Sequence, residues 1–148
     1  MEQNIFLKIK SMLYESAKED ILTIISRIEE PEILYVYIYN YNWDNGFEIP
    51  QLILDNDKCD LSIALLIFYS ADGSSYLLDK SNDRNLPQWY MFVKKLYDSI
   101  LRGKYKCGKI QFKVPLSKVQ IFKLKKILTE QEDIFFMDIE GENLDIIL

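Results

Sequence analysis

The chain has 148 residues, a length that fits one domain, and its 10 Tyr, 8 Phe and 2 Trp exclude a disordered chain. Its net charge of -5 argues against nucleic acid as the default partner and favours a basic protein instead. It contains no histidine, so it lacks the commonest general base and the commonest metal ligand.

In chain order, apolar residues spaced by three and four predict helices over residues 2–14 and 17–29. Ser16 and Glu19 have the spacing of a capping box for the second of these helices. Residues 32–41 favour a strand by composition, but Pro31 and the neighbouring acids are typical of a helix start. We expect a helix there, with a strand as the alternative.

A short helix is predicted from Pro50 to about residue 55. Asp60 is expected to cap a helix over 61–70, which is apolar on nearly all sides and should be the central buried helix. Gly73 is expected to end it, and residues 74–85 are predicted to be a loop. A further helix is predicted over residues 87–101.

The C-terminal part has a different pattern. Residues 109–114 alternate between polar and apolar, which predicts a half-buried strand. A helix is expected over 115–128, and residues 134–148 are interpreted as a terminal hairpin with Gly141 in its turn. The predicted fold is therefore a single α+β domain over residues 1–148, mainly helical, with a small C-terminal antiparallel β-sheet and a strand-helix-hairpin unit at 109–148. An all-α fold is the alternative.

Cysteine use and hydropathy predict a cytoplasmic protein. Cys59 and Cys107 lack a zinc-site spacing, and we expect both to be reduced and buried, with no cofactor. No signal peptide is recognisable at the start of the chain, and the longest apolar stretch, 61–69, is too short to cross a bilayer. We therefore expect no membrane partner.

The segment "NYNWDNGFEIP", residues 40–50, is the first candidate site. Its asparagines, Asp44 and Gly46 suit a tight turn, which is the simpler interpretation. If Trp43 and Asp44 are exposed, however, they form a candidate binding surface, because Trp is a frequent interface anchor.

Carboxylates supply a second candidate. If the helices at 31 and 61 are antiparallel, some of four acids can meet at one end of the bundle and support acid/base or metal chemistry. These acids are Asp44, Glu48, Asp60 and Asp72. Helix capping by Asp60 and turn formation by Asp72 are the simpler interpretation of these two acids.

Charge is also segregated at the C-terminal end. Residues 102–126 carry nine bases and no acid, interleaved with Tyr105, Phe112 and Phe122, which leaves nucleic-acid binding as an alternative function. Residues 127–148 carry seven acids and no base, and they could form a negative surface that steers a basic partner. The candidate binding residues in this acidic tail are Glu130, Glu132, Asp133, Glu140 and Glu142.

Two motifs carry a resemblance to a family. The first is the loop Asn-Trp-Asp-x-Gly-x-x-x-Pro at 42–50. The second lies within 59–73 and consists of Cys-Asp-Leu, Ala-Leu-x-x-Phe and Ala-Asp-Gly. Together they are similar to the pattern of the bacterial domain-of-unknown-function family 4274. Ser62 and Ile63 depart from the small pair expected there. The resemblance covers about residues 31–78. It implies that the loop and the buried helix form one unit, and it assigns no catalytic residue.

These observations lead us to expect a non-enzymatic protein-binding protein, most concretely an immunity protein that blocks a basic bacterial toxin. Small size, acidic charge and the lack of recognisable catalytic motifs support this hypothesis. An enzyme that uses the four carboxylates, with or without a metal, is the first alternative. Nucleic-acid binding through residues 102–126 is the second.

Overall fold

The computed structural model describes residues 3–148, so residue 2 of the first predicted helix lies outside the described part. Within residues 3–148 the fold consists of α-helices and two 3-10 helices. Their bounds are α1 Gln3–Tyr14, α2 Lys18–Ser26, α3 Pro31–Tyr39, η1 Trp43–Asn45, α4 Glu48–Asp55, α5 Leu61–Ser70, α6 Gly73–Leu78, α7 Pro87–Leu101, α8 Lys118–Lys125 and η2 Glu130–Phe136.

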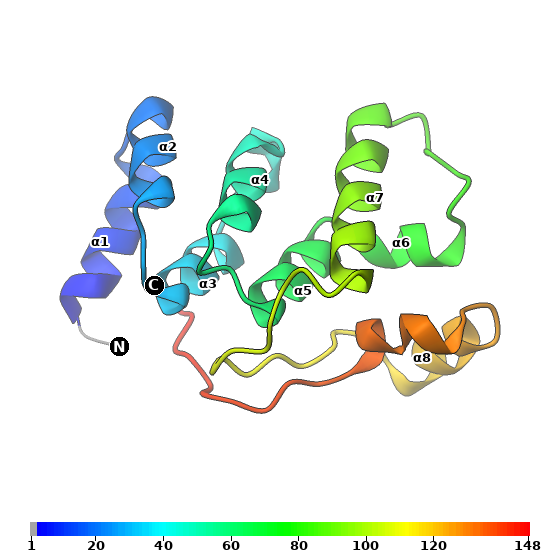
Figure 1. Ribbon diagram of the computed structural model, residues 1–148. Helices are drawn as coiled ribbons and strands as arrows, with labels where there is room; N and C mark the ends of the chain where they lie inside the picture. Colours follow the sequence, from blue (N-terminus) through cyan, green and yellow to red (C-terminus); the bar gives the residue numbers. More distant parts are fainter. Residues whose placement is uncertain (1–2) are drawn as a thin grey trace.

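The first seven α-helices form most of the core. Figure 1 shows α2, α4 and α7 standing side by side, with α1, α3 and α5 crossing beneath them. In the lower row α1 contacts α3 and α3 contacts α5, and in the upper row α2 contacts α4. The helix α5 also packs on α4, α6 and α7, so it is the centre of the molecule, as predicted.

Local sequence explains the two most buried helices. In α3, every residue from Ile33 to Ile38 is buried, and Pro31 occupies the first turn, where its missing N–H costs nothing. The helical interpretation of 32–41 is therefore confirmed over α3. In α5, residues Leu61 to Phe68 are all buried, and the Asp60 Oδ1 accepts a hydrogen bond from the Ile63 N–H at 3.0 Å, which confirms the predicted cap.

Three smaller expectations were wrong. Ser16 does not cap α2, because its hydroxyl donates to the Ser11 carbonyl and Ala17 occupies the N-cap. The predicted loop at 74–85 begins with α6, since Tyr76 and Leu77 are buried and give this turn its own apolar face. Of the two free cysteines, Cys59 is buried but Cys107 is exposed.

The predicted C-terminal β-sheet is also wrong, because residues 3–148 contain only two isolated bridges, and the all-α alternative fits. Phe112 and Ile139 exchange backbone hydrogen bonds of 3.0 and 2.8 Å in an antiparallel sense. Three residues later the sense is parallel, where the Glu142 N–H donates to the Lys109 carbonyl. The chain reverses between the two bridges, and this reversal prevents a continuous ladder.

Side chains explain why no strands form. The Ile110 carbonyl accepts a hydrogen bond from the Ser62 hydroxyl at 2.7 Å, so α5 occupies a position that a neighbouring strand would need. The first three residues of the predicted hairpin, 134–136, instead belong to η2. At the start of η2, the Glu132 carboxylate accepts hydrogen bonds from the Thr129 N–H at 3.0 Å and the Thr129 hydroxyl at 3.1 Å. Gly141 lies so close to residues 109–111 that a Cβ atom there would be 2.5 Å from the Lys109 carbonyl oxygen. The predicted alternation does hold at Ile110 and Phe112, which are both buried.

The C-terminal segment is packed onto the helices through aromatic rings. Phe135 in η2 is fully buried. Its ring stacks on the Tyr97 ring of α7 with centroids 5.1 Å apart, and its centroid lies 4.9 Å from that of the Phe68 ring. The Tyr69 hydroxyl donates to the Phe135 carbonyl. In the last residues, the Asn40 amide donates to the Ile146 carbonyl at 3.0 Å. Residues 127–148 are thus attached to α3, α5 and α7.

Candidate protein-binding surface

The loop before α4 is a well-anchored corner. The Asn42 Oδ1 accepts a hydrogen bond from the Asp44 N–H, and the Tyr41 hydroxyl donates to the Gly46 carbonyl at 2.8 Å. Gly46 has a φ of 91°, a backbone conformation that costs glycine little and other residues more. Figure 1 shows how this corner turns the chain from α3 into α4.

Trp43 and Asp44 point in different directions. The Trp43 ring is half-buried and packs edge-on against Tyr41, with centroids 5.3 Å apart, and it lies 6.5 Å from Phe92 of α7. Phe47 stacks on the same Phe92 ring at 4.7 Å. Asp44 is exposed. Trp43 therefore ties the corner to α7, and only the exposed Asp44 is fully available to a partner.

Next to this corner, α4 presents a polar ridge, which we define as Glu48, Gln51 and Asp55. Their spacing of three and four places them on one side of the helix, whereas Ile49 and Ile53 are buried on the other. The Gln51 amide donates to the Asp55 carboxylate at 3.0 Å, and Glu48 pairs with Lys18 of α2 at 2.6 Å. Burial and then the nearby Glu48 charge raise the pKa of Tyr41.

A shallow hollow lies on each side of the ridge. The hollow toward α7 has a volume of about 510 Å³ and includes Phe47, Phe92 and the exposed Met91. The hollow toward α2 has a volume of about 310 Å³ and includes Leu22 and Leu52. Ridge residues line both hollows. The face thus combines carboxylates with accessible apolar surface.

Sequence reasoning missed most of this face. Among its residues, Glu48 was considered only as part of a carboxylate cluster, and Gln51, Asp55 and Met91 were not considered. The polar spacing of the ridge opposite Ile49 and Ile53 was the available signal. The hollows depend on α2 and α7 flanking α4, which no local pattern predicts.

The five candidate residues of the acidic tail do not form one surface with this corner. Glu130, Asp133, Glu140 and Glu142 are exposed. Glu130 and Asp133 belong to η2, which packs against α7 and lies below α6 in Figure 1, whereas Glu140 and Glu142 lie in the following segment, which bridges to Ile110 and Phe112. Glu132 differs from the other four because it is buried. Its carboxylate accepts hydrogen bonds from the Tyr97 hydroxyl at 2.7 Å and the Lys80 ammonium at 2.8 Å. Glu132 is therefore a structural residue.

The four predicted carboxylates do not meet. Asp60 precedes α5 and Asp72 follows it, so they lie at opposite ends of a ten-residue helix. Asp44 and Glu48 lie at the corner before α4. Among residues 3–148, no group of three or more His, Cys, Asp or Glu side chains is placed to hold a metal ion.

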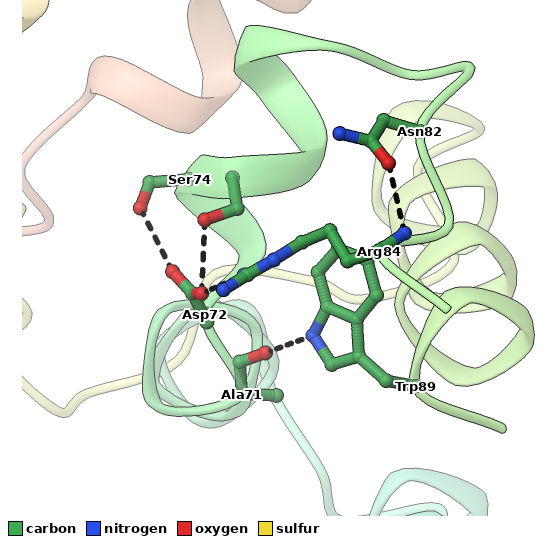
Figure 2. Close-up of polar contacts among 7 residues, drawn as sticks. Ala71, Asp72, Ser74, Asn82, Arg84 and Trp89 are labelled. Atoms are coloured by element: carbon green, nitrogen blue, oxygen red, sulfur yellow. Dashed lines mark hydrogen bonds and ion pairs between the residues drawn. The ribbon is translucent and has the colours of Figure 1, made fainter. Parts of the chain in front are cut away.

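Asp72 instead holds a second corner together (Figure 2). Its carboxylate accepts hydrogen bonds from the hydroxyls of Ser74 and Ser75, and it pairs with the Arg84 guanidinium. Arg84 also lies over the Trp89 ring, whose Nε1–H donates to the Ala71 carbonyl at 2.6 Å. The Ala-Asp-Gly motif thus fixes the turn between α5 and α6 and the loop that leads to α7.

The buried Asp60 leads to a prediction about pH. The Oδ2 atom of Asp60 has no hydrogen-bond partner. Burial raises the pKa of the Asp60 carboxyl group, the hydrogen bond from the Ile63 N–H partly offsets this rise, and the negative charge of Glu32 adds to it. A raised folded-state pKa gives stability that is present below the unfolded pKa of about 3.9 and is lost as the pH rises through the folded value. We expect Asp60→Asn, which keeps a capping oxygen, to gain stability relative to the wild type as the pH rises above about 4. Urea unfolding at each pH measures this, and a pH-independent difference would contradict it.

Comparison with known proteins supports the resemblance seen in the sequence. Residues 29–101 match the model of the family described as a domain of unknown function (DUF4274). This match covers α3 to α7 and is longer than the predicted 31–78. No curated protein and no solved structure matched the chain. In the described residues, no helix has the length and hydropathy needed to cross a membrane. The resemblance is therefore confirmed: from residue 29 to residue 101 this chain is similar to the DUF4274 family.

Proposed function

We propose that this protein is a non-enzymatic binding protein that holds a basic protein partner against the α4 face, and most concretely that it is a cytoplasmic immunity protein that neutralises a toxin. The observation that carries the proposal is the polar ridge of Glu48, Gln51 and Asp55 between two partly apolar hollows. Apolar side chains of the partner would enter the hollows, while its lysines or arginines would pair with the ridge carboxylates.

Charge supports this choice of partner. The chain carries 23 acids against 18 bases, so its field attracts a cationic surface over several ångströms in dilute salt. Nuclease toxins bind phosphates through cationic sites, and an acidic ridge can cover such a site. The exposed tail acids, among them Glu140 and Glu142, would add to the attraction without touching the partner.

Two variants with equal changes in charge distinguish direct contacts in the interface from long-range electrostatic attraction of the partner. Glu48→Gln combined with Asp55→Asn alters the ridge, whereas Glu140→Gln combined with Glu142→Gln alters the tail. We expect the ridge variant to weaken binding about tenfold or more, mainly through faster dissociation, because it removes contacts in the interface. The tail variant should change mainly the association rate, and only at low salt.

The test is to co-express the chain with the product of the neighbouring gene, isolate a complex and measure growth. A salt-sensitive complex together with growth rescue, both weakened in the ridge variant, is the expected result. The absence of both a complex and rescue would refute the immunity proposal. A complex that the ridge variant leaves unchanged would mean that the partner binds another surface.

A further inference from the structure

The helix α8 and its C-cap residue Lys126 have an outer face that carries two apolar residues followed by two basic ones. Val119, Phe122, Lys123 and Lys126 follow the spacing i, i+3, i+4, i+7, which places them on one side of a helix. Leu124, the buried residue of α8, lies on the opposite side. Val119 is 62% exposed and Phe122 is 61% exposed. We call these four residues the outer face of α8.

The apolar residues of this face are not used in the fold. Ile127, which is 57% exposed, extends the apolar surface beyond the end of α8. The Lys126 ammonium lies 4.4 Å from the Phe122 ring centroid, so the aromatic ring and the cation present a combined surface. Neighbouring large apolar side chains that remain in water on a small protein commonly indicate a binding surface.

The same region is a local concentration of positive charge. All nine bases of residues 102–126 are exposed. The ion pairs found in residues 3–148 join Lys18 to Glu48, Lys80 to Glu132 and Arg84 to Asp72, so none of them involves this block. The acidic tail is hydrogen-bonded to the backbone of the block, in one place through the Asp138 carboxylate, but none of the three ion pairs joins a tail acid to a base of the block. The block is therefore available to an anionic partner.

We propose that the outer face of α8 binds an acidic amphipathic segment of another protein. Carboxylates of that segment would pair with Lys123 and Lys126, while its apolar side chains would pack on Val119 and Phe122. This pairing satisfies both the charges and the apolar surface of the face. It is separate from the proposed α4 surface, because Figure 1 places α8 at the end of the molecule away from α2 and α4.

Two other anionic partners fit this face less well. A phosphate backbone would pair with the lysines but would leave Val119 without an apolar contact. An anionic membrane favours a continuous apolar stripe with lysines at its borders, whereas Lys126 lies between Phe122 and Val119 around the helix here. In addition, the exposed Glu130 and Asp133 of the nearby η2 would be repelled by any extended anionic surface.

The proposal can be tested with one labelled probe peptide. The probe is an amphipathic helix with leucines at i, i+3, i+4 and i+7 and glutamates elsewhere, and fluorescence anisotropy with the full chain measures its binding. We expect binding that weakens when the leucines of the probe are changed to serine and is lost when its glutamates are changed to lysine. An RNA oligonucleotide and phosphatidylglycerol vesicles are assayed in parallel.

Variants of the chain assign the binding to this face. Phe122→Ser, and Lys123→Glu combined with Lys126→Glu, should each weaken probe binding about tenfold or more. The matched controls are Leu7→Ser, at a position that is also 61% exposed, and Lys94→Glu combined with Lys95→Glu, at two exposed lysines of α7; neither should change it. Three outcomes would overturn the proposal. The first is that the two outer-face variants leave probe binding unchanged, and the second is that the probe does not bind below roughly 1 mM. The third is that RNA or the vesicles bind more tightly than the probe through the same residues.

Discussion

Replacing Phe135 with alanine is expected to lower the free energy of unfolding by about 3 to 5 kcal/mol, the usual cost of removing a buried aromatic ring. The Phe135 side chain is fully buried between Tyr97 of α7 and Phe68 of α5. Its removal leaves a cavity where the C-terminal segment joins the helices and loses two aromatic contacts. Urea unfolding followed by circular dichroism at 222 nm measures the change.

The control for this prediction is Phe122→Ala, which removes the same ring from a position that is 61% exposed. Because little buried surface is lost there, we expect a change within roughly 0.5 kcal/mol. A loss of less than about 1 kcal/mol in Phe135→Ala would mean that η2 contributes little to the stability of the helical core.

The second large effect is expected at Glu132. Burial alone would raise its pKa, but hydrogen bonds from Lys80, the Thr129 N–H and the Tyr97 hydroxyl outweigh burial and lower the pKa to about 2. Because the folded pKa lies below the unfolded value of about 4.3, the ionised carboxylate gives stability above that pH, and this stability is lost as the pH falls toward 2. At pH 7, Glu132→Gln should cost roughly 2 to 3 kcal/mol.

The pH dependence distinguishes this charge effect from a packing effect. The difference in unfolding free energy between the wild type and Glu132→Gln should shrink below roughly pH 4, where the unfolded chain already binds the proton. Glu130→Gln, an exposed position two residues earlier, serves as the control and should stay within about 0.5 kcal/mol of the wild type. A difference that is the same at pH 3 and pH 7 would contradict the assigned ion pair.

Features determined by local sequence could be predicted, and α5 is the clearest case. Its cap at Asp60, its length and its burial on all sides follow from residues 60–70 alone, because they depend on hydrogen bonds and apolar surface within that segment. The helix α7 is similar, with Pro87 in its first turn and a regular apolar face. For such segments, the pattern and the tertiary environment favour the same structure.

Features that depend on distant residues could not be predicted. The residues around Gly73 suggested a helix end followed by a loop, but Asp72 adopts a left-handed turn that Arg84 stabilises, and α6 begins directly after it. Residues 109–114 have the alternation of a strand, yet Ser62 takes the Ile110 carbonyl. Glu132 resembled a surface acid because its partner Tyr97 lies 35 residues away in the chain.

The packing of η2 on α7 and α5 lies partly outside the stretch of the chain that is similar to DUF4274. The match to DUF4274 ends at residue 101, but in this chain the rings of Phe68 and Tyr97, both inside the match, are covered by Phe135, which lies outside it. The stretch that is similar to DUF4274 is therefore shorter than the unit that packs together in this chain. A fragment that ended at residue 101 would leave the faces of Phe68 and Tyr97 that Phe135 covers in contact with water.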